Sequence, residues 1–122
     1  MSPVALRRLK PVARFRLRVS AGDQVAIGPG KVALLEAIRD EGSLTAAAKS
    51  IGISYRRAWT MLDEMQRTLK YPVVASATGG PHGGGSLLTA VGEEIVARYR
   101  RIEAAAAASC AEDIQALLEL VA

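Results

Sequence analysis

The side chains best suited to molecular recognition form a run of hydroxyl and guanidinium groups near the middle of the chain. They are Ser54, Tyr55, Arg56, Arg57 and Thr60. A guanidinium group can donate two hydrogen bonds to the edge of a guanine base, and hydroxyl groups can reach phosphate oxygens. The stretch 42–62 contains no acidic residue, so a polyanion can approach it without charge repulsion. Residue types and spacing therefore predict contacts to nucleic acid by Arg56, Arg57 and Thr60.

The sequence holds little that would support catalysis or metal binding. With one histidine, His82, and one cysteine, Cys110, it excludes His pairs, an internal disulfide and Cys-based zinc sites. An enzyme with the Gly-rich stretch 78–85 as a phosphate cradle is an alternative. That stretch lacks the Gly-Lys-Ser/Thr ending of a P-loop and does not fit the dinucleotide fingerprint. We therefore expect no catalytic residue, no metal and no cofactor, and a protein that is not an enzyme.

Length and composition predict one soluble domain. A chain of 122 residues, half of them apolar, has the size of one domain, and no apolar run is long enough to span a membrane. The N-terminus lacks the apolar stretch of a secretory signal, so we expect a cytoplasmic protein without membrane contact. Residues 1–22 contain bases and no acid, whereas residues 102–122 contain acids and no base. The basic zones favour a polyanionic partner, with a merely solvated Arg-rich surface as the alternative.

The elements that must position the candidate residues follow from the spacing of apolar side chains. Alternation over 14–20 predicts a strand with Phe15, Leu17 and Val19 facing inward, and 24–27 predicts a return strand. Three helices are expected next, over residues 31–41, 44–50 and 55–70.

Caps and turns separate the predicted helices. Ser43 and Ser54 are suited to cap the second and third helices, and Gly52 to form the tight turn between them. The helical angles of Tyr55 and Trp59 border the apolar stripe of the third helix, so spacing alone favours packing for both.

The remaining sequence predicts a hairpin and a long helix. Strands at 73–76 and 86–88 would flank the Gly-rich tip, and Thr89 would cap a helix beginning near Ala90. An apolar stripe runs along this helix and continues after it, and its length is large for a small monomer. We expect this stripe, together with the N-terminal segment, to form the dimer contact. Its main members are Ile95, Tyr99, Ile102, Leu117 and Leu118.

This order of elements predicts a winged helix-turn-helix. The fold class is mainly α with small β, with an N-terminal strand pair, a Gly-rich β-hairpin wing and a long C-terminal helix. We expect a single DNA-binding domain over 1–122, with its core at about 14–105 and a dimerising helical extension at 106–122. Two-fold symmetry would match a palindromic operator.

Three segments resemble one family. The stretches 42–48 (GSLTAAA) and 52–59 (GISYRRAW), with the wing 77–80 (ATGG) and 83–85 (GGG), are similar to the N-terminal domain of ModE-type, molybdate-responsive transcriptional regulators. The resemblance covers about residues 14–105 and implies a homodimer that binds double-stranded DNA at promoters for molybdenum uptake or molybdoenzyme genes. By this likeness DNA contacts fall on Ser54, Tyr55, Arg56, Arg57, Thr60, Thr78, Gly79, Gly80, His82 and Ser86.

The chain also departs from that family. Full-length members carry further C-terminal domains that bind molybdate, and we expect 122 residues to be too few to hold them. A separate molybdate-sensing protein is therefore an expected partner, with a different effector as the alternative.

A winged-helix module that binds protein without specific DNA binding is the second functional hypothesis. Salt dependence separates the two, because phosphate contacts weaken steeply with added salt.

Overall fold

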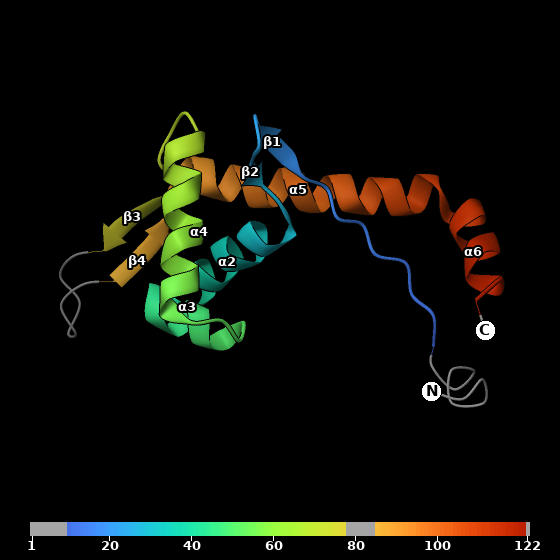
Figure 1. Cartoon of the computed structure of the whole chain (residues 1–122), viewed down its shortest axis with the longest axis horizontal. Helices are drawn as coiled ribbons and strands as arrows, with labels where there is room; N and C mark the ends of the chain where they lie inside the picture. Colours follow the sequence, from blue (N-terminus) through green and yellow to red (C-terminus); the bar gives the residue numbers. More distant parts are fainter. Residues whose placement is uncertain (1–9, 78–84, 122) are drawn as a thin grey trace. The chain divides into compact units, whose positions relative to one another are not determined.

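The computed structural model describes residues 10–77 and 85–121 and divides into two compact units. One unit comprises residues 16–99, and the other comprises residues 1–15 with 100–122. Figure 1 shows the elements in sequence colours. They are β1 (Val19–Ala21), β2 (Gln24–Ile27), α2 (Pro29–Glu41), α3 (Leu44–Ser50), α4 (Tyr55–Thr68), β3 (Val74–Ala77), β4 (Gly85–Leu88), α5 (Ala90–Ser109) and α6 (Ala111–Glu119). This composition confirms the predicted fold class, mainly α with two small strand pairs.

The N-terminal strand is shorter than predicted. β1 begins at Val19 and pairs antiparallel with β2, with an irregularity in register between Val19 and Ser20. Leu17 is half-buried and packs against the core, but Phe15 and Val19 are exposed, so the prediction that they face inward was wrong. The physical reason is that residues 10–18 lie outside the strands, so the alternation that contains Phe15 has no sheet face to bury. Val19 is paired in β1, but all three residues of β1 are exposed.

The three middle helices supply most of the core of the 16–99 unit. Their predicted existence is confirmed, although α2 begins at Pro29, two residues early, because proline suits the first helical turn. Both predicted caps are present: the Oγ of Ser43 accepts from the N–H of Ala46, and that of Ser54 from the N–H of Arg57. The largest fully buried side chains are Val32, Leu34, Leu35, Ile38, Met65 and Val73.

A tight turn separates α3 from α4. Gly52 lies in this turn with φ of +73°, a backbone conformation that side chains with a Cβ rarely adopt. The N–H of Ile53 donates to the carbonyl of Ala48 at 3.0 Å, which closes the turn. Glycine at this position therefore sets the direction in which α4 leaves α3.

The β3–β4 hairpin is attached to the helices at two points. The N–H of Ser86 donates to the carbonyl of Gly42 at 2.8 Å, which ties β4 to the start of the helix-turn-helix. The hydroxyl of Thr89 donates to the carbonyl of Pro72 and accepts from the N–H of Gly92, so Thr89 caps α5 as predicted. Strand β4 packs against α2, and the hairpin extends from the helices (Figure 1) in the position of a wing.

Helices α5 and α6 complete the described chain. The first part of α5 contributes Val96 and Tyr99 to the core of the 16–99 unit. Within the described part of the other unit, residues 10–15 and 100–121, no side chain is buried. Over the residues that the structure describes, no helix combines the length and apolar character needed to cross a bilayer.

Candidate nucleic-acid interface

Helix α4 has one side in the core and one side open to solvent. Ala58, Met61 and Met65 are buried and mark the core side. On the solvent side the first two turns present exposed Tyr55, Arg56, Arg57 and Trp59 and half-buried Thr60. The structure therefore brings together on one helix four of the side chains that the sequence predicted as contacts, Tyr55, Arg56, Arg57 and Thr60, with Ser54 as the cap.

The two hydroxyl groups of this segment have different hydrogen-bonding capacity. The Oγ of Ser54 accepts from the N–H of Arg57 at 3.0 Å, which leaves its proton available for an acceptor such as a phosphate oxygen. The Oγ1 of Thr60 donates to the carbonyl of Arg56 at 3.0 Å, which leaves its oxygen available to accept. Ser54 is thus suited to a phosphate, and Thr60 to an amino group on a base.

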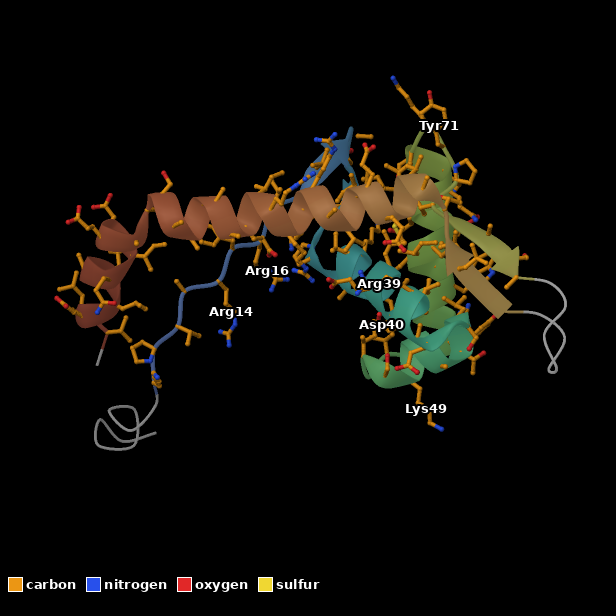
Figure 2. All side chains as sticks on the ribbon, turned by 180° about the vertical axis from the view of Figure 1, so that it is seen from behind. Arg14, Arg16, Arg39, Asp40, Lys49 and Tyr71 are labelled. Carbon is orange, nitrogen blue, oxygen red and sulfur yellow. The ribbon has the colours of Figure 1, made fainter. Side chains whose placement is uncertain are left out.

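Positive charge surrounds the start of α4. Arg56 and Arg57 are exposed, and Lys49 in the last turn of α3 is also exposed and points away from the fold (Figure 2). The first acid of α4, Asp63, is held by Arg67 at 3.0 Å. Lys49 was missed as a candidate contact, although the acid-free stretch that contains it was the available signal.

Tyr55 and Trp59 are both more than half exposed, at 55% and 53%. The interpretation that they pack against the core was therefore wrong. The core side of α4 is centred on Ala58, Met61 and Met65. At about 100° per residue, Tyr55 lies roughly 90° and Trp59 roughly 130° away from that centre.

A groove of about 670 Å³ lies beside α4, between it, the β1–β2 pair and the start of α2. At its wall the ammonium of Lys31, 7% exposed, donates to the carbonyl of Val25 and pairs with Glu64 at 2.9 Å. The hydrogen bond from Lys31 is the main cause that lowers the pKa of Glu64; burial opposes it. The other charged residues along the groove are Arg16 (labelled in Figure 2), Arg18, Asp23 and Arg57.

Comparison with known proteins adds independent information. No family model matches the chain. It is 47% identical over 81 residues to the molybdenum-pterin-binding protein MopB of Rhodobacter capsulatus, covering 66% of this chain and 30% of the relative. It is 42% identical over 92 residues to the molybdenum transport protein ModE of Azotobacter vinelandii, covering 74% and 34%. It is 34% identical over 87 residues to the DNA-binding transcriptional dual regulator ModE of Escherichia coli, covering 71% and 33%.

Over this domain the chain is similar to ModE-type regulators. The resemblance inferred from the helix-turn-helix and wing motifs is therefore confirmed. The chain spans about a third of the length of the curated relatives it matches.

The predicted wing contacts of the ModE-type domain are only partly visible. Ser86 lies in β4, half-buried, and its N–H is used in the bond to Gly42. Thr78, Gly79, Gly80 and His82 fall outside the described residues.

The predicted dimer residues of the ModE-type domain differ in accessibility. Tyr99 is buried, and its hydroxyl donates to the carbonyl of Leu17 at 2.9 Å, so its side chain is part of the core. Ile95 and Leu118 are half-buried, whereas Ile102 and Leu117 are exposed. Among residues 10–77 and 85–121, no three His, Cys, Asp or Glu side chains converge as a metal site requires.

Proposed function

We propose that the chain is a sequence-specific regulator of transcription that binds double-stranded DNA, with α4 as its recognition helix. The observation that supports this most strongly is the exposed, acid-free start of α4, with Arg56 and Arg57, in a winged helix-turn-helix. In this motif the N-terminal residues of the second helix contact base edges in the major groove. The relative from Escherichia coli is named a DNA-binding transcriptional dual regulator, which supports the same role here.

The proposed mechanism divides the contacts into two groups. Arg56 and Thr60 contact base edges, because the exposed side of α4 presents both. Ser54, Lys49 and the wing contact phosphates, with the free proton of Ser54 donated to a phosphate oxygen. Two further residues of α4, Tyr55 and Arg57, complete the proposed interface. The wing residues in it are Thr78, Gly79, Gly80, His82 and Ser86.

The target genes of the proposal are those of molybdenum uptake or molybdoenzymes. The names of the relatives support this, because they include a molybdenum transport protein and a molybdenum-pterin-binding protein. We also propose a separate molybdate-sensing protein as partner, in keeping with the molybdenum-related names of the relatives. Molybdate added to the purified chain should leave its affinity for DNA unchanged. A change in affinity would place the sensing in this chain.

We further propose that the chain acts as a homodimer on a palindromic operator. Ile102, Leu117 and Leu118 belong to a unit whose described residues include no buried side chain, so a second copy could remove their apolar surface from water. Sedimentation at micromolar concentration should give a dimer, and replacing Leu117 by Asp should give a monomer. A monomer for the unmodified chain contradicts this part of the proposal.

The test of the main proposal is selection of bound fragments from sheared genomic DNA at two salt concentrations. We expect a palindrome near molybdenum-related genes, and binding that weakens steeply with salt because contacted phosphates release counterions. A palindrome elsewhere would retain the regulator and reject the molybdenum link. Recovery of nothing above background would reject DNA binding and favour a protein-interaction module.

A further inference from the structure

Two aromatic side chains project from the solvent side of α4 without any role in the core. Tyr55 and Trp59 are 55% and 53% exposed, although the core side of the same helix is filled by Ala58, Met61 and Met65. Because they are four residues apart, the two side chains lie on the same side of the helix, one turn apart. They form a small apolar surface, which we call the aromatic pair.

The surroundings of the aromatic pair are polar and positively charged. Arg56 is exposed next to Tyr55, and half-buried Thr60 follows Trp59. The nearest acid along the helix, Asp63, is neutralised by Arg67 at 3.0 Å. A complementary partner must therefore present apolar groups within a field of negative charge.

The major groove of DNA has that combination. Phosphates supply the negative charge, and the 5-methyl group of thymine is the apolar group exposed on the floor of the groove. Aromatic and small apolar side chains recognise thymine through this methyl group. An acidic protein segment would satisfy the charge, but it would not make binding depend on a methyl group of DNA.

We propose that Trp59 and Tyr55 are specificity-determining residues that contact thymine 5-methyl groups in the major groove. This inference rests on the proposed DNA-binding function. It divides recognition on α4 between Arg56 and Thr60, which offer hydrogen bonds, and the aromatic pair, which selects thymine by apolar contact. Because four residues span only about 6 Å along a helix axis, we expect the two contacted thymines to lie within a few base pairs of each other.

The first test replaces thymine by uracil, one position at a time, in a duplex selected from random sequence by the chain. Uracil keeps the hydrogen-bonding groups of thymine and removes only the methyl group. At each of two positions the unmodified chain should lose affinity by about 4-fold. This ratio corresponds to the loss of one buried methyl group. Trp59→Ala should abolish the loss at one of these positions, and Tyr55→Ala at the other.

Tyr71→Ala is the matched control. Tyr71 is also an exposed aromatic, at 63%, but it follows the C-terminal end of α4 and projects away from it (Figure 2). This variant should keep the full response to uracil. Trp59→Phe should keep part of the response, since a smaller aromatic ring remains. All four variants should unfold at the same temperature as the unmodified chain, because none of the changed side chains is buried.

A second test uses the fact that Trp59 is the sole tryptophan in the sequence. Its fluorescence therefore reports on this one position without labelling. The selected duplex should change the emission, and the duplex with uracil at the Trp59 position should change it less.

The outcomes separate the inference from the function on which it rests. If a specific duplex is selected but uracil weakens binding equally in the unmodified chain and in Trp59→Ala, the aromatic pair does not read thymine and only the inference fails. An unchanged emission on a bound duplex has the same meaning. If no duplex is enriched above background, the proposed function fails and the inference fails with it.

Discussion

The two units of this chain both contain helices with apolar side chains, which are buried in one unit and exposed in the other. In the 16–99 unit, α2, α3 and α4 bury Leu34, Leu35 and Ile38 completely. Among the described residues of the other unit, Ile102, Leu117 and Leu120 are more than half exposed and none is buried. Helix α5 belongs to both, and burial along it ends at Tyr99. The spacing of apolar residues on a helix therefore predicts a face, but a neighbouring element decides whether that face is covered.

The largest expected effect is the loss of unfolding free energy when a leucine is replaced by alanine, which should differ between the two units. Leu35→Ala should lower the free energy of unfolding by about 2–5 kcal/mol, because it leaves a cavity among close-packed side chains. Leu117→Ala should change it by less than about 0.5 kcal/mol, because Leu117 is exposed. Urea unfolding, at a concentration where sedimentation shows monomer, measures both. Equal losses would mean that the two regions share one core.

A smaller effect is expected where two backbone segments of the 16–99 unit approach each other. A Cβ at Gly92 would lie 2.3 Å from the carbonyl oxygen of Val73, so Gly92→Ala must displace α5 from the start of the wing. We expect a loss of about 1–3 kcal/mol in unfolding free energy. Gly30→Ala is the matched control, because its Cβ would meet only the end of Met61 at 3.4 Å. Thermal melts measure both variants, and Gly30→Ala should leave the free energy of unfolding unchanged.

The third prediction compares the regions by DNA affinity. Arg56→Ala should weaken binding to the selected duplex by about 1–3 kcal/mol, as for an arginine that contacts a base. Arg101→Ala, an exposed arginine of the other unit, should have little effect. Fluorescence anisotropy on selected and random duplexes measures both. An equal loss on both duplexes for Arg56→Ala would make Arg56 a phosphate contact instead.

The smallest expected effect concerns the ion pair of Lys31 and Glu64. Because Lys31 lowers the pKa of Glu64 in the folded protein, this pair stabilises the fold above the pKa of the unfolded glutamate, about 4.3. The stabilisation is lost as the pH falls through the lowered folded pKa. Glu64→Gln should therefore cost about 1–2 kcal/mol at neutral pH and less below about pH 4. A difference from the unmodified chain that does not depend on pH would contradict this assignment.

Local sequence signals predicted much of the helix-turn-helix. Ser43, Ser54 and Thr89 cap helices as predicted, because a hydroxyl next to an apolar helix start satisfies a free backbone N–H. The exposed position of Arg56 followed from the helical period alone.

Predictions that depended on distant contacts were less accurate. Phe15 and Val19 alternate with charged residues as in a half-buried strand, yet the strand begins only at Val19. Tyr55 and Trp59 border an apolar stripe in sequence, but the core reaches only its centre at Ala58, Met61 and Met65. The hydrogen bond from Ser86 to Gly42 joins residues 44 positions apart, and no local pattern indicates it.

By itself, the sequence determined the order and type of the elements in the 16–99 unit, its helix caps and the acid-free start of α4. These depend on interactions within a few residues, such as capping bonds and helical periodicity. Only the tertiary structure decided which faces are covered: Trp59 is exposed and Tyr99 is buried. It also decided that Lys31 pairs with Glu64. The physical reason is that burial and ion pairing depend on which distant segments meet, and a helical stripe is equally apolar whether or not another element covers it.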